Sequence, residues 1–218
     1  MLSAGITFTV GGVPGRLVTI EGLDGSGKTT LAAGVAATLR ARGLVVELLR
    51  EPGGVELSEA IRALVQDPAR RCDPRTEALL YAAARAQLVA ERLVPLRADG
   101  RWVLLDRFVD SSLAYQGAGR GLGMAAIAAL NAFATGGLTA DRTLLLRVAP
   151  EVGRARTRGR GAEADRLERE DAGFFARVAA GYDELAAREP ERIRVLDAGA
   201  PAAAVLAEAM GALEDLLG

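Results

Sequence analysis

Five short runs of apolar and β-branched residues are spaced along the chain, separated by longer segments with helical character. The predicted strands are residues 16–21, 44–49, 102–106, 143–148 and 192–197. The predicted helices are residues 27–42, 55–66, 74–99, 123–134 and 201–217. Strands that alternate with helices are typical of a parallel sheet with helices on both faces. We therefore predict an α/β fold, a three-layer sandwich with a five-stranded parallel sheet, in one domain over residues 16–218.

Two segments do not fit this alternation. Residues 1–15 have no basic stretch followed by a long apolar run, so a flexible extension is predicted there and a signal peptide is not. Residues 154–171 are rich in arginine, glutamate and glycine. Such a charge run usually forms a solvated surface, but its position after the fourth strand favours a mobile lid.

Composition narrows the possible functions. The net charge of −1 offers no basic field for nucleic acid, and no apolar run reaches the length of a membrane span. The chain has no histidine, which excludes histidine as a general base or metal ligand. The single cysteine, Cys72, excludes an internal disulfide and fits a reducing compartment, so we expect a cytoplasmic protein.

The sequence GLDGSGKT at residues 22–29 matches the phosphate-loop pattern G-x-x-x-x-G-K-[ST], with a strand before it and a helix after it. Backbone N–H groups of such a loop hold the phosphates of a nucleotide such as ATP. The residues expected to do so are Gly22, Asp24, Gly25, Ser26, Gly27, Lys28, Thr29 and Thr30. Lys28 is the only lysine among 27 basic residues, which supports a working loop. The fold is therefore predicted to be of the P-loop NTPase type.

Asp106 and Arg107 follow the apolar run at residues 102–105. Ligands of open α/β sheets bind at the carboxyl ends of the strands, so both side chains are expected to face the loop. Thr29 and Asp106 are the predicted Mg²⁺ ligands, with Asp106 acting through water, and Arg107 is a candidate phosphate grip. A surface ion pair is the alternative for these two residues.

Several segments, in the same order along the chain, resemble the motifs of one protein family. The sequence VLLDRFVDSSLAYQ at residues 103–116 resembles the signature of thymidylate kinases, and REPGG (50–54), EALLYAAAR (77–85), GAGR (117–120) and DRLE (165–168) agree with it. The resemblance runs from about residue 16 to the C-terminus. It implies transfer of the ATP γ-phosphate to dTMP, giving dTDP and ADP for dTTP synthesis, with Mg²⁺ as cofactor and a homodimer as the assembly.

The resemblance also implies a set of dTMP-binding residues. They are Asp24, Glu51, Pro52, Tyr81, Arg85, Arg107, Ser112, Tyr115 and Gln116. Within this set, Asp24 is expected to accept a hydrogen bond from the 3′-hydroxyl, and Arg107 to hold the phosphate of dTMP.

The remaining members are assigned to the base and the sugar. Arg85 is expected to reach thymine O4, and Ser112 or Gln116 the polar edge of the base. Tyr115 is placed against the sugar, where it disfavours a 2′-hydroxyl. Tyr81 stands where the family usually has a phenylalanine stacked on thymine.

The phosphate loop itself carries no arginine at positions 24–26, although some thymidylate kinases have one there. The sequence RTRGR at residues 156–160 resembles the lid that supplies an arginine in the bacterial subgroup without it. We expect Arg156 to bind ATP, and we expect Arg158 and Arg160 to act in catalysis with Lys28 and Arg107. Arg160 aligns best, and Arg166 is a further candidate. A phosphate acceptor is already ionised near pH 7, so no general base is required.

Other classes of nucleotide-binding protein fit the sequence less well. A nucleoside kinase would need a carboxylate base beside the acceptor hydroxyl, for which Glu21 or Asp106 is available. A regulatory GTPase usually has an [NT]-K-x-D motif, and a chain whose only lysine is Lys28 has none. A DNA-acting ATPase is disfavoured by the short length and near-neutral charge.

Overall fold

The computed structural model describes residues 15–158 and 165–217, without the side chain of Arg158. Residues 1–14 of the predicted N-terminal extension, and Arg160, lie outside the described residues. No helix of the described part is both long and apolar enough to cross a bilayer.

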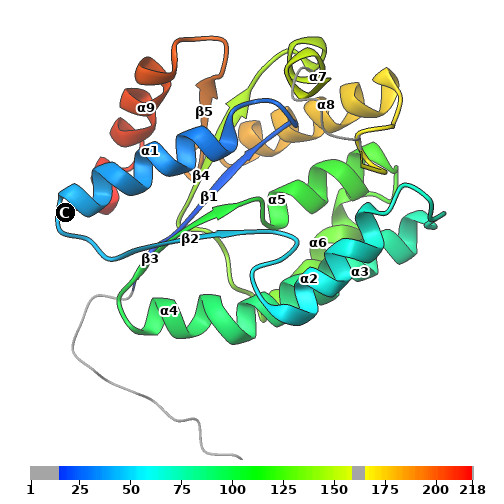
Figure 1. Ribbon diagram of the computed structural model, residues 1–218, viewed down its shortest axis with the longest axis horizontal. Coiled ribbons are helices and arrows are strands. Elements are labelled where there is room, and N and C mark those ends of the chain that lie inside the picture. The colour runs from blue at the N-terminus through cyan, green and yellow to red at the C-terminus, as the bar shows by residue number, and fades with distance from the viewer. Residues whose placement is uncertain (1–14, 159–164, 218) are drawn as a thin grey trace, which may run out of the picture.

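The centre of the fold is a five-stranded parallel sheet (Figure 1). Its strands are β1 (Leu17–Gly22), β2 (Val46–Arg50), β3 (Trp102–Asp106), β4 (Arg142–Arg147) and β5 (Ile193–Asp197). Their order across the sheet is β2-β3-β1-β4-β5, and all neighbouring pairs are parallel. The predicted fold class is thereby confirmed.

Helices cover both faces of the sheet. The longer ones are α1 (Lys28–Ala41), α2 (Glu56–Gln66), α3 (Pro74–Leu88), α6 (Met124–Thr135), α8 (Ala172–Arg188) and α9 (Ala202–Gly211). Shorter helical segments are α4 (Val94–Ala98), α5 (Val109–Ser112), α7 (Pro150–Arg158), π-helical turns at Val89–Leu93 and Leu113–Gly119, and a 3₁₀ turn at Glu214–Leu216. The first π-helical turn joins α3 to α4, so the helix predicted over residues 74–99 is one continuous helical run.

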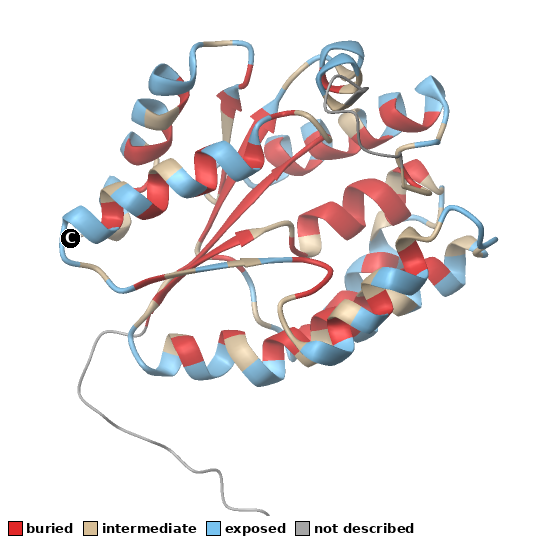
Figure 2. Cartoon of the chain, in the orientation of Figure 1, coloured by how far each residue is buried: buried red, intermediate tan, exposed pale blue. Residues whose placement is uncertain are grey.

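Successive side chains of a strand point to opposite faces of the sheet, so the hydrophobic core has one part on each face. Val18 and Ile20 of β1 face α1 and α9 in one hydrophobic cluster, whereas Leu17 packs with the helical run that ends in α4. All of β1 is buried, as expected for a central strand of a parallel sheet. Figure 2 shows this central strand fully buried between helices that are buried only on their inner sides.

Besides α7, two further helical segments were not predicted: residues 109–119 and α8. The signal for α8 was present in the sequence, because Phe174, Val178, Tyr182 and Leu185 share one face and are buried. Asp171 caps this helix by accepting a hydrogen bond from the backbone N–H of Phe174 at 2.6 Å. Residues 109–119 have no such pattern: they include two serines and two glycines, and nearly all are buried.

The predicted lid begins within a helix. α7 covers the first part of residues 154–171, and residues 159–164 lie outside the described part of the chain. The last part returns to the body of the fold, where the backbone N–H of Arg166 donates to Gln66 O at 3.2 Å.

Candidate active site

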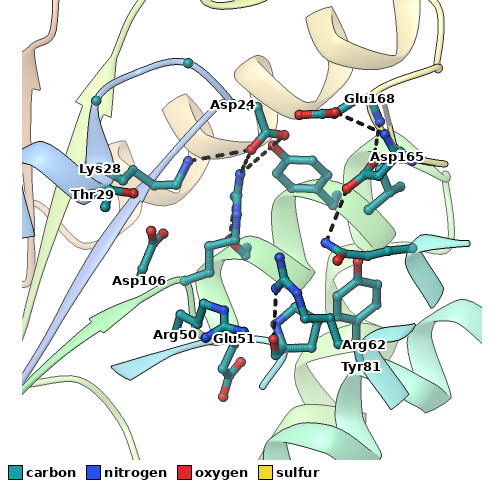
Figure 3. A pocket seen from close by; sticks show the side chains of 18 of the residues that line it. Asp24, Lys28, Thr29, Arg50, Glu51, Arg62, Tyr81, Asp106, Asp165 and Glu168 are labelled. Atoms are coloured by element: carbon teal, nitrogen blue, oxygen red, sulfur yellow. Dashed lines mark hydrogen bonds and ion pairs between the residues drawn. The ribbon is translucent and has the colours of Figure 1, made fainter. Parts of the chain in front are cut away.

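A pocket of about 470 Å³ opens at the carboxyl ends of β1, β2 and β3 (Figure 3). It brings together most of the predicted site residues: Asp24, Gly25, Gly27, Lys28, Thr29, Thr30, Glu51, Pro52, Tyr81, Arg85, Asp106, Arg107, Tyr115, Gln116 and Arg156. Further lining residues were missed by the sequence analysis: Arg50, Arg62, Gln66, Ser111, Asp165, Leu167 and Glu168. A cleft of this size suits a small-molecule ligand.

The phosphate loop turns sharply between β1 and α1 because glycines allow it. Gly22, Gly25 and Gly27 have φ values of 135°, 78° and 98°, in a region that residues with a Cβ rarely adopt. A Cβ on Gly25 would also lie 2.2 Å from the carbonyl oxygen of Gly153 in α7. The loop therefore lies directly against α7, and Gly25 cannot be exchanged without moving that helix.

Lys28 begins α1 and folds back over the loop. Its Nζ donates to Gly22 O at 3.2 Å and to Leu23 O at 3.0 Å, and lies 3.8 Å from Asp24 Oδ1. Burial lowers the pKa of Lys28 to about 8, and the positive charge of Arg107 adds to this effect. An anion placed at the loop would favour the charged form of this lysine.

Arg107 follows β3 in a left-handed backbone conformation, with φ of 71°. This conformation costs a residue with a Cβ about 1–2 kcal/mol, and it aims the side chain at the phosphate loop. Nη2 lies 2.7 Å from Asp24 Oδ1 and 3.2 Å from the Tyr115 hydroxyl. Nη1 lies 3.1 Å from Ser111 Oγ and 3.4 Å from the Tyr182 hydroxyl.

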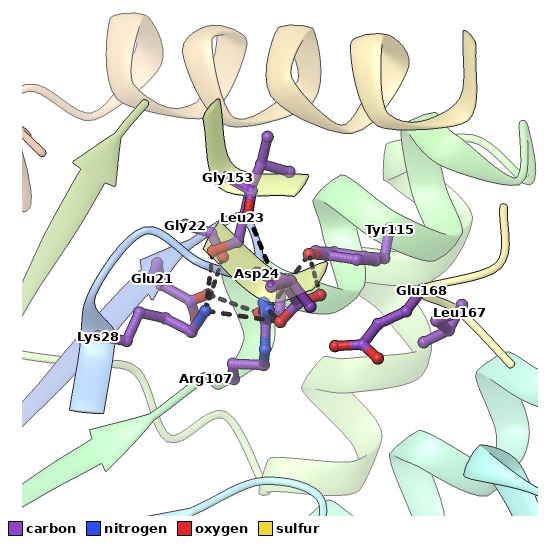
Figure 4. A network of polar contacts seen from close by, with 12 residues as sticks. Glu21, Gly22, Leu23, Asp24, Lys28, Arg107, Tyr115, Gly153, Leu167 and Glu168 are labelled. Carbon is purple, nitrogen blue, oxygen red and sulfur yellow. Dashed lines mark hydrogen bonds and ion pairs between the residues drawn. The ribbon is translucent and has the colours of Figure 1, made fainter. Parts of the chain in front are cut away.

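Glu21 lies behind Arg107 and is wholly buried (Figure 4). It accepts hydrogen bonds from the backbone N–H of Phe108 at 2.7 Å, from Ser111 Oγ at 2.6 Å and from the Tyr182 hydroxyl at 2.9 Å. Burial, with a smaller contribution from the Asp110 charge, raises the pKa of Glu21 to about 7, while Arg107 opposes this shift. Because three donors already occupy this buried carboxylate, it is poorly placed to act as the base of a nucleoside kinase.

The opposite end of the pocket is built around Arg85, which is 2% exposed. Its guanidinium donates to Glu51 Oε2 at 2.7 Å, to Ser112 Oγ at 2.9 Å, to Phe108 O at 2.9 Å and to Asn131 Oδ1. Ser112 is thus bound to Arg85 and is not among the residues that line the pocket, whereas its neighbour Ser111 is.

Tyr81 and Gln116 complete this end. Burial raises the pKa of the Tyr81 hydroxyl, which therefore keeps its proton at neutral pH. Gln116 is 2% exposed, and its Nε2 donates to Glu77 Oε1 at 2.8 Å. The pocket is thus cationic at the phosphate loop, and Tyr81, Gln116 and Arg85 bring an aromatic ring, an amide and a guanidinium to the far end.

Comparison with known proteins identifies the family. A family model described as thymidylate kinase matches residues 20–209. The chain belongs to the thymidylate kinase family. The reaction of this family is the phosphorylation of dTMP to dTDP, so the chain is a nucleoside monophosphate kinase.

Individual relatives agree over nearly the full length. A thymidylate kinase of Alkalilimnicola ehrlichii is 49% identical over 204 residues, which is 93% of this chain and 92% of the relative. One of Deinococcus radiodurans is 47% identical over 201 residues, or 92% and 97% of the two chains. The crystal structure of thymidylate kinase from Ehrlichia chaffeensis superposes with a TM-score of 0.75 at 31% identity, covering 92% of this chain and 99% of that chain.

The lid arginines of this thymidylate kinase family member are only partly described. Arg156 lines the pocket and donates to Ala198 O, in the loop after β5, at 3.2 Å. Arg166 has a different place, because Nη2 lies 2.6 Å from Glu77 Oε2 and Nε donates to Val65 O at 2.9 Å. Arg166 therefore anchors the end of the lid to α2 and α3, and it is not among the pocket-lining residues.

Proposed function

We propose that the chain transfers the γ-phosphoryl group of ATP to dTMP, with ATP on the phosphate loop and dTMP between Arg107 and Tyr81. The observation that carries this proposal is the meeting of two cations at one carboxylate: Arg107 and Lys28 lie 2.7 Å and 3.8 Å from Asp24 Oδ1. Lys28 belongs to the ATP-binding loop, and Arg107 is the residue predicted to hold the phosphate of dTMP. Two phosphate groups held by them would face each other in this part of the pocket.

In this arrangement the protein contributes position and charge. Lys28 and the loop N–H groups hold the phosphates of ATP, and Arg107 holds the phosphate of dTMP, so that the acceptor oxygen is directed at the γ-phosphorus. No proton has to be removed from an acceptor that is already ionised. The buried Glu21 orients Arg107 through the hydroxyls of Ser111 and Tyr182.

Mg²⁺ is proposed to bind on the loop side of the pocket, held by Thr29 and, through water, by Asp106. Oδ1 of Asp106 is buried without a hydrogen-bond partner among the described residues, which fits a role toward a bound water or ion. Figure 3 shows both side chains near Lys28. When bound, the cation neutralises charge on the β- and γ-phosphates.

The base is proposed to occupy the far end, with Tyr81 stacked on it and Tyr115 against the sugar. Arg85 and Gln116 face the polar edge of the base, and Ser112 acts through Arg85. Asp24 is proposed to accept a hydrogen bond from the 3′-hydroxyl. These roles rest on the positions of the side chains in the pocket and on the family resemblance.

The lid is proposed to supply the missing loop arginine. Arg156 already lines the pocket beside the loop after β5, which fits a place near the adenine end of ATP. Arg158 and Arg160 are proposed to supply charge to the transferring phosphoryl group. Closure of the lid would bring their charge to the transition state more than to the open complex.

A homodimer is proposed through the face made by α2, α3 and α6. Leu57 and Leu64 of α2, Leu79 of α3 and Phe133 of α6 are exposed, and Phe133 is 89% exposed. A second copy would bury these apolar side chains. A cytoplasmic location is proposed because a chain with a single cysteine, Cys72, fits a reducing compartment.

The direct test is product analysis. Purified protein incubated with ATP, Mg²⁺ and dTMP should form dTDP and ADP in equal amounts, as resolved by ion-exchange chromatography. Lys28→Ala is the matched control: it should stay folded and lose nearly all transfer, because the charge at the transferred phosphoryl group is gone. Turnover near the parental rate in folded Lys28→Ala would contradict the proposal.

A further inference from the structure

Glu77, in the first turn of α3, is completely buried and was assigned no role by the sequence analysis. Its Oε1 accepts from Gln116 Nε2 at 2.8 Å and from Arg120 Nε at 3.2 Å. Its Oε2 accepts from Arg120 Nη2 at 3.0 Å and from Arg166 Nη2 at 2.6 Å. Two guanidinium groups thus form ion pairs with one buried carboxylate.

The charge of Glu77 determines which way the Gln116 amide points. A carboxylate only accepts hydrogen bonds, whereas an amide has a donating NH₂ group and an accepting oxygen. The NH₂ group of Gln116 must therefore face Glu77. Its Oε1 then serves the pocket, and no group in the described part of the chain donates a hydrogen bond to it.

An accepting oxygen at this place favours some bases over others. Thymine and uracil carry an N–H at ring position 3, which such an oxygen can accept. Cytosine carries a lone pair there, so its nitrogen and the Gln116 oxygen would repel each other. Arg85, at the same end of the pocket, presents only donors, which suit the O4 carbonyl of thymine and oppose the amino group of cytosine.

We propose that Glu77 is a positioning residue that holds the Gln116 amide in one orientation and so makes the site select pyrimidines with an N–H at position 3. The proposal rests on the placement of the base given above. The Glu77 carboxylate also binds Arg166. The side chain that orients the Gln116 amide therefore also anchors the end of the lid.

The test compares three acceptors on one enzyme preparation, so that the fraction of active protein cancels from the ratios of kcat/KM. The kcat/KM values for dTMP, dUMP and dCMP are measured for the parent and for Glu77→Gln. An amide at position 77 can face Gln116 with either its oxygen or its nitrogen, so Gln116 is free to turn over. We expect the ratio of dTMP to dCMP to fall about tenfold or more, as for the loss of one well-made buried hydrogen bond.

Two controls make the result specific. The ratio of dTMP to dUMP should not change in Glu77→Gln, because these bases share the N–H and differ only in a methyl group. Arg120→Gln should leave the ratio of dTMP to dCMP at the parental value, because it removes a partner of Glu77 and keeps the carboxylate. If Glu77→Gln lowers kcat/KM for all three acceptors equally, Glu77 only balances the arginines and the proposal is overturned.

The variant Gln116→Leu distinguishes the placement of the base at Gln116 from the positioning role of Glu77. If it lowers the ratio of dTMP to dCMP while Glu77→Gln does not, the base placement holds and the role of Glu77 is overturned. If neither variant changes the ratio, the base does not lie at Gln116 and the placement fails with the proposal.

An exchanged pair covers the case in which Glu77→Gln does not fold. Glu77→Gln combined with Gln116→Glu keeps one carboxylate in the network, and the amide at 77 donates to the carboxylate at 116. The second oxygen of that carboxylate still accepts from the base, so the parental ratio of dTMP to dCMP should be kept. Loss of the ratio in the folded exchanged pair would overturn the proposal.

Discussion

Nη2 of Arg107 lies 2.7 Å from Oδ1 of Asp24, so the guanidinium that follows β3 meets the carboxylate in the third position of the phosphate loop. The two residues are 83 positions apart in the sequence. They are neighbours because β1 and β3 are adjacent parallel strands whose carboxyl ends lie at the same edge of the sheet.

Replacing Arg107 with alanine and with glycine separates its chemical role from its backbone strain. Both variants should raise the KM for dTMP and lower kcat, because the acceptor phosphate loses a bidentate cation. Only the glycine variant relieves the left-handed backbone, so it should be more stable than the alanine variant by about 1 kcal/mol. Steady-state kinetics and urea unfolding check both statements. A parental KM for dTMP in either variant would show that Arg107 does not hold the acceptor.

Binding of ATP should take up a proton at alkaline pH. Lys28 has a pKa of about 8 in the free protein, and phosphates at the loop favour its charged form, so its pKa rises on binding. Around pH 8.5 the lysine is largely neutral before binding and charged afterwards, whereas well below pH 8 it is charged in both states. Calorimetric titration with ATP in two buffers of different ionisation enthalpy measures the uptake. Absence of uptake at the higher pH, or its persistence in Lys28→Met, would refute this assignment.

Glu21 should make stability depend on pH in a defined direction. Its pKa is about 7 in the folded protein against 4.5 in the unfolded chain, so the native state retains a proton that the unfolded chain releases between these values. The stability contributed by protonated Glu21 is fully present below pH 4.5 and is lost as the pH rises through 7.

The variant Glu21→Gln isolates this contribution. Relative to the variant, the parent should lose about 2–3 kcal/mol of unfolding free energy between pH 5 and pH 8, at about 1.4 kcal/mol per pKa unit. Urea unfolding at the two pH values provides the measurement, and the other titrating groups cancel in the difference. An equal difference at both values would mean that Glu21 does not titrate in this range.

The sequence predicted those parts of the site whose functional groups come from residues next to one another in the chain. The phosphate loop needs glycines, one lysine and a hydroxyl in sequence, and Arg107 directly follows a strand that ends beside the loop. Gly25, Gly27, Lys28, Thr29 and Thr30 of the loop line the pocket, as does Arg107, whereas Gly22 and Ser26 are not among the lining residues. The family resemblance added Tyr81, Arg85, Tyr115 and Gln116, which also line it.

The supporting residues could not be predicted in the same way. Ser111 and Tyr182 come from two helical segments that the pattern analysis did not assign, and both bind Glu21. Asn131 and Glu77 look like ordinary polar positions of helices, and only the packing of α3 and α6 shows that they hold Arg85 and Gln116. Hydrogen bonds between residues far apart in sequence leave no local pattern.

The lid is tested by changing Arg156, Arg158 and Arg160 to alanine together. An arginine that arrives on lid closure stabilises the transition state more than bound ATP, so kcat should fall much more than ATP affinity. In well-studied nucleotide hydrolases such an arginine contributes about 10³–10⁵ in rate. Single-turnover kinetics and ATP titration separate the two effects. A kcat within a few-fold of the parent would mean that these arginines only form a solvated surface.

The choice of acceptor tests the central claim most directly. The measurement is kcat/KM in a coupled ADP assay with ATP and Mg²⁺, for dTMP and for thymidine, which differ only in the phosphate that Arg107 is proposed to hold. The account predicts strong preference for dTMP, because thymidine offers no phosphate to Arg107. Of the two carboxylates considered as a base, Glu21 is already occupied by three donors and Asp106 is proposed to serve Mg²⁺. Phosphorylation of thymidine as efficient as that of dTMP would contradict the account and favour a nucleoside kinase.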